Sequence, residues 1–351
     1  MRAFSSLRPS RAFFWIAAVC GLATLGLAAM QAPARPWHRR RTVAIAAAPG
    51  GGEYFDYVYF DAASRRAYLS QGTTMDVVDV DSGKQVGRVS GLRRDHGVAL
   101  PPGLGQGFIS DGDAGEVAVF DVHTLRIIKH IPTAKDSDGM LYEPVDGRVW
   151  CLEGDPNSVS VIDPRSQSVV TTLPLGGAPE QAVTDGHGMI YDNLADKNQV
   201  AVINAHTLKV TARWPVAPAG EPVAMAMDAV HRKLFIGARN PAVMVEMDAD
   251  SGKIVAGPFP IGPSVDSCVF DPGTAMAACS TRDGAIHVFH ENASGIVTPF
   301  QVIKTEFGAK TMALDPRTHD FLTDTASRSA SAPGRRPSFR PGTLHLLIYG
   351  R

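Results

Sequence analysis

A unit of about 42 residues recurs along the chain, and this repeat constrains the fold more than any other feature. Its clearest part reads VAVFD from Val117, VSVID from Val159 and VAVIN from Val200. Looser copies begin at Met75, Met244, Ile286 and Leu344. The residues that end successive copies are 42, 42, 41, 44 and 42 positions apart: Asp79, Asp121, Asp163, Asn204, Asp248 and His290. Internal repeats of this length are typical of solenoids and propellers.

A second pattern precedes each copy: an apolar strand, a turn and another apolar strand, as in YVYFDAASRRAYLS from Tyr57. The turns align at seven positions, Asp61, Pro101, Glu143, Asp185, Asp228, Asp271 and Asp315. Another apolar run, such as VVTTLPLGG, follows each polar turn. Each unit therefore contains four short strands of alternating pattern. The 34 glycines and 25 prolines of the chain suit such a turn-rich protein.

Four-stranded units that repeat every 40–45 residues predict an all-β fold, a β-propeller of seven blades with four antiparallel strands each. The last unit ends after its third strand, GTLHLLIY. The N-terminal stretch TVAIAAAPGGGE has the pattern of the missing outer strand. We therefore expect an N-terminal strand at 42–48 to complete the last blade and close the ring, which removes an open sheet edge.

The units resemble the YVTN-type β-propeller repeat, and residues 42–351 resemble the bacterial exported YncE-like family. The stretch NSVSVIDPRSQSVVTTLPLGGAPEQAVTDGHGMIY at 157–191 carries the order strand, Asx turn, strand, Gly-Pro of that repeat. The resemblance implies the fold, but it brings no catalytic residues with it. The chain also lacks the WD dipeptide and the GxSxG, CxxCH and HExxH motifs.

The first 34 residues have the pattern of a signal peptide. Three arginines (Arg2, Arg8 and Arg11) precede an uncharged, mostly apolar run at 12–30, and Ala-Pro-Ala at 32–34 offers a cleavage site. An uncleaved membrane anchor is the alternative, and a lipoprotein is disfavoured because Val19 precedes Cys20. The interpretation assigns 35–41 to a basic linker and 42–351 to the propeller. It predicts a periplasmic or secreted protein, in contact with a membrane only if the segment stays uncleaved.

Charge argues against nucleic acid as a partner. Three of the 34 basic residues and none of the 35 acidic residues lie in 1–34, so the rest of the chain has a net charge of −4. Binding to phosphates needs a basic field instead. We expect a monomer whose partner is a small polar ligand, a peptide or an envelope protein.

The stretch RRDHG at 93–97 places Asp95 beside His96. His96 lies five residues before Pro101, at the entrance to its inner strand. The same offset in the other units selects five more ionisable residues and Val223. The six ionisable candidates for a ligand-binding site at the mouth of the channel are Asp56, His96, Asp138, Glu180, Asp266 and Lys310. Because neighbouring residues at a strand entrance point apart, we expect His96 to meet Asp56 and Asp138 rather than Asp95.

Three interpretations of this ring stay open. It is a hydrated channel mouth, a site for a small ligand or metal, or a catalytic site. No cofactor is established by the sequence. A divalent cation, Ca²⁺ or Mg²⁺, in the central channel is one hypothesis. Its ligands would be His96, Asp56, Asp138, Glu180 and Asp266.

Two further features draw attention. Cys268 and Cys279 flank a turn symmetrically and are candidates for a disulfide, whereas Cys151 has the position of Cys279 in another unit and is expected to be a buried thiol. An insertion at 325–342, rich in Ser, Pro and Arg, is predicted to be flexible and to emerge at the channel mouth. It is either a plain loop or a basic lid or docking segment that uses Arg328, Arg335, Arg336, Phe339 and Arg340.

The function predicted from the sequence is a binding module that uses the face of the propeller where loops enter the inner strands, here called the top face. The alternative is a metal-assisted hydrolase of the lactonase type, with a cation at the top of the channel. A redox enzyme is disfavoured because haem motifs are missing. The sequence favours a protein without enzymatic activity, but it leaves the question open.

Overall fold

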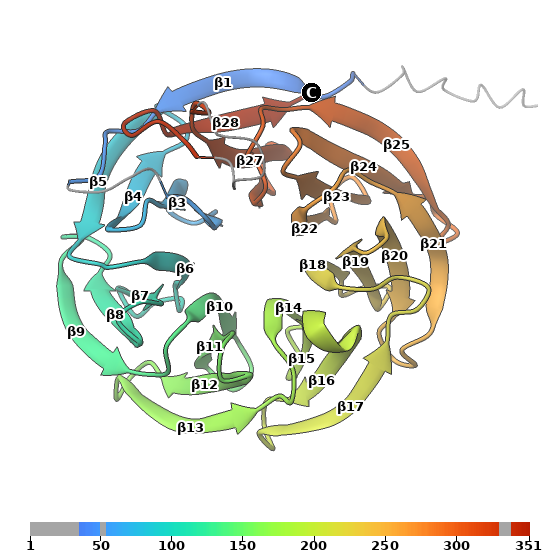
Figure 1. Ribbon diagram of the computed structural model, residues 1–351, viewed down its shortest axis with the longest axis horizontal. Helices are drawn as coiled ribbons and strands as arrows, with labels where there is room; N and C mark the ends of the chain where they lie inside the picture. Colours follow the sequence, from blue (N-terminus) through green and yellow to red (C-terminus); the bar gives the residue numbers. More distant parts are fainter. Residues whose placement is uncertain (1–34, 50–53, 330–337) are drawn as a thin grey trace, which may run out of the picture. The chain divides into compact units, whose positions relative to one another are not determined.

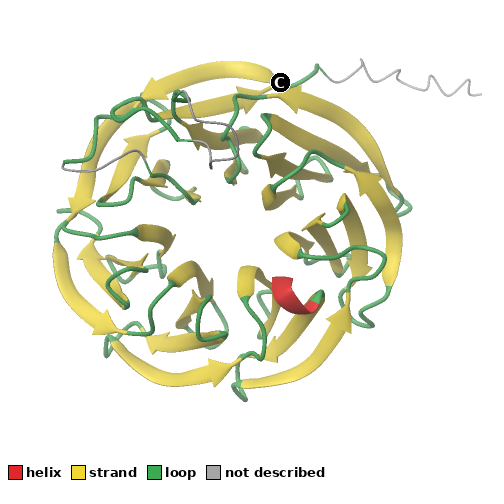
Figure 2. Cartoon of the chain, viewed as in Figure 1, coloured by secondary structure: helices red, strands yellow, loops and turns green. Residues whose placement is uncertain are grey.

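The computed structural model describes residues 35–49, 54–329 and 338–351, and Pro36–Arg351 form one compact unit. Within the described ranges the regular structure consists of β-strands and one short turn of 3₁₀-helix, η1 (Ala195–Lys197) (Figure 2). No helix in these ranges is long and apolar enough to cross a membrane. The predicted signal peptide at 1–34 lies outside the described residues.

The strands form seven four-stranded antiparallel sheets arranged around a central channel, so the predicted seven-bladed β-propeller is confirmed (Figure 1). From the inner to the outer strand, blade 1 contains β2 (Val58–Asp61), β3 (Arg66–Ser70), β4 (Thr74–Asp79) and β5 (Lys84–Ser90). Blade 2 contains β6 (Asp95–Ala99), β7 (Gln106–Asp111), β8 (Glu116–Asp121) and β9 (Ile127–Pro132). Blade 3 contains β10 (Ser137–Glu143), β11 (Arg148–Glu153), β12 (Ser158–Asp163) and β13 (Ser168–Pro174).

The remaining four blades follow the same order. Blade 4 contains β14 (Pro179–Thr184), β15 (Met189–Leu194), β16 (Gln199–Asn204) and β17 (Lys209–Pro215). Blade 5 contains β18 (Pro222–Asp228), β19 (Lys233–Arg239), β20 (Ala242–Asp248) and β21 (Ile254–Pro260). Blade 6 contains β22 (Val265–Asp271), β23 (Met276–Thr281), β24 (Ala285–Glu291) and β25 (Val297–Lys304). Blade 7 contains β26 (Met312–Asp315), β27 (Asp320–Thr325), β28 (His345–Gly350) and β1 (His38–Ala44).

Strand β1 closes the ring by pairing with β28 near the C-terminus, on the outside of blade 7 (Figure 1). Its bounds differ from the predicted 42–48, because the strand begins at His38 and ends at Ala44. Four residues of the predicted basic linker, His38–Arg41, therefore belong to the propeller. Their charged side chains are exposed on an outer strand, while Trp37 just before them is buried against Phe321. A charged outer strand has no strong apolar pattern, which explains why the prediction began too late.

The recurring V-x-V segments are the third strands of their blades, and their side chains are buried on both faces. The aspartates that end them form Asx turns as predicted: the carboxylate of Asp121, for example, accepts the backbone N–H groups of His123 and Thr124. The described residues pack into seven apolar clusters, one between each pair of neighbouring blades. The core therefore lies between the sheets, and the channel at the centre remains available for polar side chains.

Candidate functional site

A cavity of about 600 Å³ opens at the top of the central channel, and all seven blades contribute to its lining. All six ionisable residues that the repeat register selects line it: Asp56, His96, Asp138, Glu180, Asp266 and Lys310. The structure thus brings together the complete predicted set. Val223, at the seventh position, is a buried apolar residue outside this lining. Blade 5 contributes Arg239 to the lining instead.

An irregularity at the start of the inner strands positions these side chains. In blade 2 the pairing of β6 with β7 shifts between Asp95 and Val98, and His96 lies within the shift. Asp138 and Glu180 lie in equivalent shifts of blades 3 and 4, and Asp266 lies in one of blade 6. A β-bulge frees a strand end from regular pairing and re-aims its side chains. The bulges therefore turn these residues toward the channel mouth.

Serine hydroxyls on the second strands hold the entrances in place. Ser70 Oγ accepts the backbone N–H of Asp56 at 2.7 Å, and Ser110 Oγ accepts that of Gly97 at 2.9 Å. The Ser110 hydroxyl also contacts the Asp138 carbonyl of the next blade, and the Ser280 hydroxyl donates to the Lys310 carbonyl at 2.5 Å. All three of these buried serines recur at one position of the repeat, a signal that sequence reasoning missed.

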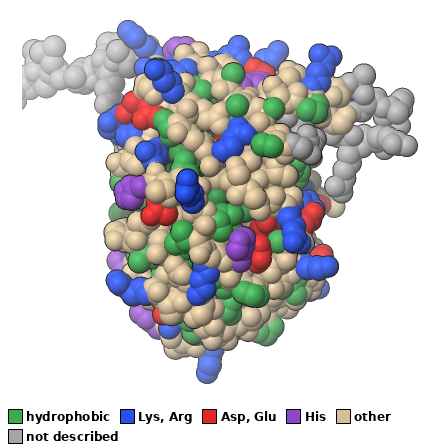
Figure 3. Space-filling model, turned by 90° about the vertical axis from the view of Figure 1, so that its left-hand side faces the viewer, with side chains coloured by type: hydrophobic (Ala, Val, Ile, Leu, Met, Phe, Trp, Pro, Cys, Tyr) green, Lys and Arg blue, Asp and Glu red, His purple; other side chains and the backbone are tan. Residues whose placement is uncertain are grey.

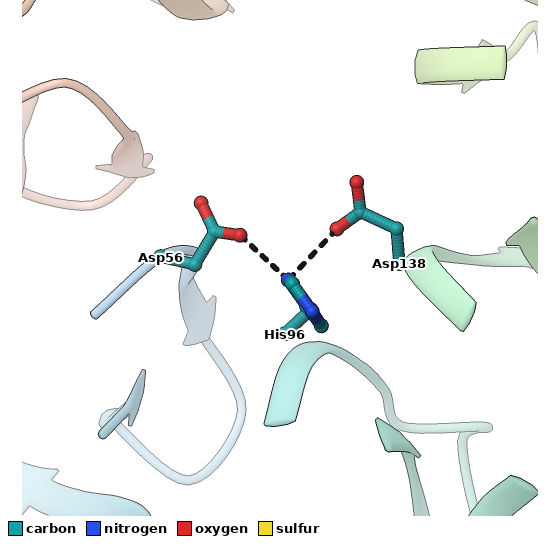
Figure 4. Close-up of side chains that lie close together, drawn as sticks. All are labelled: Asp56, His96 and Asp138. Atoms are coloured by element: carbon teal, nitrogen blue, oxygen red, sulfur yellow. Dashed lines mark hydrogen bonds and ion pairs between the residues drawn. The ribbon is translucent and has the colours of Figure 1, made fainter. Parts of the chain in front are cut away.

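His96 lies between two carboxylates from the neighbouring blades (Figure 4). Its Nδ1 is 2.7 Å from Asp56 Oδ2 and 3.1 Å from Asp138 Oδ1, and the Tyr54 hydroxyl is 3.0 Å away. Burial lowers the pKa of His96, but the hydrogen bonds and charges of Asp138 and Asp56 outweigh it and raise the pKa to about 10. The imidazole is therefore a cation at neutral pH.

Asp95 is not the partner of His96, as the strand geometry predicts. Its carboxyl group is fully buried, burial raises its pKa well above the usual range, and the ion pairs of His96 are with Asp56 and Asp138 instead. The far edge of the His96 ring packs closely against the backbone of the next turn. A Cβ on Gly112 would lie 3.0 Å from His96 Nε2, which is tighter than an ordinary contact, so glycine at this position gives the ring its space.

The opposite half of the cavity is basic. Lys310 Nζ lies 2.5 Å from Asp56 Oδ1 and 2.7 Å from Asp266 Oδ2, so it bridges blades 1 and 6. Arg239 also pairs with Asp266, and an Arg282 nitrogen lies 3.6 Å from the same carboxylate. Three cations therefore gather around Asp266, and positive side chains are concentrated on this side of the cavity.

Arg239 and Arg282 were missed by the sequence analysis. Arg239 ends the second strand of its blade, and Arg282 directly follows the second strand of the next blade. Loops between the second and third strands also reach the top face, so a search of these loops for charge would have found both residues.

Glu180 faces the cavity without a charged partner. It makes no ion pair within the described part of the chain, whereas the other mouth carboxylates Asp56, Asp138 and Asp266 do. Burial, reinforced by the charge of Asp138, raises the pKa of Glu180 to about 8. Its carboxyl group is therefore mostly protonated at neutral pH and can donate a hydrogen bond or release a proton. Carboxyl groups with such pKa values are found often at functional sites.

The predicted metal ligands fit a divalent cation poorly. Asp56, His96 and Asp138 each offer one atom within 4.8 Å of the others. However, the buried His96 ring is held between two carboxylates with its Nε2 close against Gly112, and the Lys310 ammonium already pairs with Asp56 and Asp266. A metal would have to displace both cations of the protein. Asp56 is instead paired twice from within the chain, with His96 and with Lys310.

A smaller cavity of about 250 Å³ lies along the inner strands and has a largely apolar lining. Tyr57 lines both cavities, and the charges of four mouth carboxylates add to the effect of burial in raising its pKa. The side chain of Gln181 in blade 4 reaches blades 5 and 6. Its Oε1 accepts the backbone N–H groups of Met225 at 3.0 Å and Cys268 at 3.1 Å. The channel therefore changes from charged at the mouth to apolar further in.

The ends of the insertion at 325–342 come together at the rim of the site. Arg328 and Phe339 form an isolated antiparallel bridge, and the Phe339 ring packs against Phe55 and lines the cavity. The Arg328 guanidinium lies 4.5 Å from the Phe307 ring centre, and Arg340 is exposed. The predicted lid residues Arg335 and Arg336 lie outside the described residues.

Cys268 and Cys279 pair directly across β22 and β23 and form a disulfide in the structure. Cys151, at the equivalent position of blade 3, is a buried free thiol.

The chain matches no family model, and no curated protein matches it.

Proposed function

We propose that the chain is an exported, YncE-like YVTN-repeat propeller that binds a small polar ligand in the cavity at its channel mouth. The observation that carries this proposal is the convergence of charged side chains from all seven blades on one cavity of about 600 Å³. This volume is in the range of pockets that take small molecules. The site is therefore large enough to hold a small molecule.

The distribution of charge suggests the class of ligand. Arg239, Arg282 and Lys310 form a basic half, which suits a carboxylate or another anion. Asp136 and Asp138 give the opposite half its acidic charge, and the protonated Glu180 beside them offers a hydrogen-bond donor, so this half suits an ammonium group or hydroxyl groups. A ligand that carries both kinds of group, such as an amino acid or a short peptide, would meet complementary charge at each end.

The mouth is a better candidate for the working surface than the outer wall. Figure 3 shows one side of the ring, where Lys and Arg side chains are separated by acidic, apolar and uncharged ones rather than joined into one patch. Most exposed large apolar residues of the described chain, such as Val86 and Val170, lie on outer strands of different blades, and the others, such as Val230, lie in turns. Such isolated residues do not mark an interaction site.

Export to the periplasm or the exterior is part of the proposal. It is supported by the signal-like pattern at 1–34 and by the disulfide between Cys268 and Cys279, which is stable in oxidising compartments. The metal-assisted hydrolase remains the alternative. It is less well supported, since Lys310 and protonated His96 take the place that a catalytic cation would need.

Calorimetric titration with matched compounds tests the proposal. Glutamate and a dipeptide carry both acidic and ammonium groups. Succinate carries only carboxylates, and putrescine carries only ammonium groups. We expect glutamate and the dipeptide to bind more tightly than succinate and putrescine. Arg282→Gln and Glu180→Gln should each weaken binding by about tenfold, the effect of losing one charged or buried hydrogen bond. Arg126→Gln, an exposed change at a turn on the opposite face, is the control.

The proposal fails if none of these compounds binds. It also fails if Arg282→Gln and Glu180→Gln bind as the unchanged protein does.

A further inference from the structure

A second cluster of ionisable side chains lies on the face opposite the channel mouth, between blades 5 and 6. Asp228 ends the inner strand β18, His231 follows in the turn, and Glu291 ends the third strand β24 of the next blade. One ligand atom from each residue lies within 4.8 Å of those of the other two. Neither the repeat motif nor the proposed function accounts for this cluster.

Glu291 is the unusual member. Its side chain is buried, with 4% of the residue exposed, and neither carboxylate oxygen has a hydrogen-bond partner within the described part of the chain. Asp228, by contrast, accepts the N–H groups of Val230 and His231 on Oδ1 and the His231 ring on Oδ2, at 2.6 Å. A buried acidic group without a donor is costly. Here it points toward a second buried carboxylate.

Two carboxylates in such a position repel each other unless a proton or a cation lies between them. Lys233 does not serve this purpose, because its Nζ pairs with Glu246, and within the described part of the chain the His231 ring pairs with Asp228 rather than with Glu291. His231 completes the cluster from the solvent side, with 64% of its side chain exposed, so it can rotate to adjust its distance to a bound ion.

We propose that Asp228, His231 and Glu291 bind a divalent transition-metal ion such as Zn²⁺. Two carboxylates and one imidazole suit zinc, whereas Ca²⁺ and Mg²⁺ prefer oxygen ligands alone. Three protein ligands leave room for water on the exposed side. Because Glu291 comes from blade 6 and the other two residues from blade 5, the ion would cross-link neighbouring blades. This site is independent of the cavity at the channel mouth.

Titration of the tag-free, metal-stripped chain with Zn²⁺ tests the inference. We expect one equivalent to bind and to raise the melting temperature, because an ion that binds only the folded state stabilises it. Co²⁺ should bind with the visible absorption of a low-coordinate site, and Mg²⁺ should bind far more weakly. His231→Ala, an exposed change that leaves the fold intact, and Glu291→Gln, which keeps the shape of the buried side chain, should each lower the affinity by about tenfold or more.

His319→Ala provides the matched control. Like His231, His319 pairs with an aspartate that ends an inner strand: its Nδ1 lies 2.9 Å from Asp271 Oδ2. This pair belongs to neither candidate metal cluster of the described residues. Its removal should leave Zn²⁺ binding unchanged. The inference is overturned if no Zn²⁺ binds, in which case a shared proton holds Asp228 and Glu291 together. It is equally overturned if Zn²⁺ binds as tightly to His231→Ala and Glu291→Gln as to the unchanged chain.

Discussion

His96 owes its charge to its place in the ring of blades. In an isolated strand, its imidazole would lose and gain a proton near neutral pH. Between Asp56 and Asp138 it stays protonated, and its positive charge in turn keeps Asp56 ionised: although burial opposes it, Lys310 and His96 hold the pKa of Asp56 well below its usual range. The His96 cation thus pairs with carboxylates from two neighbouring blades at once. At the same mouth, Glu180 lacks such a partner and remains available to a ligand.

This charge makes the contribution of His96 to stability depend on pH. Its pKa is about 10 in the folded protein against 6.5 for a free side chain. The contribution is therefore complete below pH 6.5 and is lost as the pH rises toward 10. We expect the difference in free energy of unfolding between the unchanged protein and His96→Gln to shrink by about 1 kcal/mol per pH unit in this interval. Urea denaturation at a series of pH values measures it.

A matched variant separates this effect from the titration of other groups. His123→Gln removes an exposed imidazole from a turn in which only the backbone N–H is bound by Asp121. Its effect on the free energy of unfolding, measured at the same pH values, is the baseline for an exposed imidazole. If the His96→Gln difference follows the same pH dependence as the His123→Gln difference, the imidazole of His96 is not the cation described above.

The inner strands act as the elements that join the blades at the channel. Gln181 of β14 binds two backbone N–H groups, one on β18 and one on β22. Met225 and Cys268, which carry these groups, are both buried. A single side-chain oxygen thereby connects three consecutive blades, where apolar contacts connect only two.

Replacement of Gln181 by alanine should therefore destabilise the propeller. It leaves two buried N–H groups without an acceptor, and we expect a loss of about 2 kcal/mol in the free energy of unfolding. Gln106→Ala is the control, because Gln106 accepts only from the half-buried Gln167 side chain and should change stability by about 0.5 kcal/mol or less. Equal losses for the two variants in urea denaturation would contradict the role given to Gln181.

The strand entrances also show where sequence reasoning ends. The repeat register predicts which residues reach the mouth, because each blade repeats the same offset from its turn. It does not reveal the bulges that aim them, since no residue type is common to His96, Asp138, Glu180 and Asp266. Nor does it reveal that Lys310 lies between Asp56 and Asp266. That pairing depends on the ring bringing blades 1, 6 and 7 together, and it weakens the metal hypothesis.

At the scale of the whole molecule, seven blades can be counted from the sequence because each repeats the same alternation and turns. The closing strand is harder to predict. Strand β1 takes the outer position of blade 7, where its first four residues are exposed and three of them are arginines. Its attachment depends instead on backbone pairing with β28 and on Trp37, whose ring stacks on Phe321 at 5.3 Å. Both contacts link segments that are far apart in the chain.

Ring closure should therefore decide whether the propeller unfolds as one unit. We compare a chain that begins at residue 46 with one that begins at residue 35, which keeps Trp37 and β1. The shorter chain exposes the edge of β28 and uncovers Phe321, so we expect a lower melting temperature and association between copies through the free edge. Loss of the buried Trp37 side chain alone should cost about 3 kcal/mol or more. Calorimetry and light scattering measure both effects, and a shorter chain that stays monomeric with an unchanged melting temperature would show that β1 is not needed to close the ring.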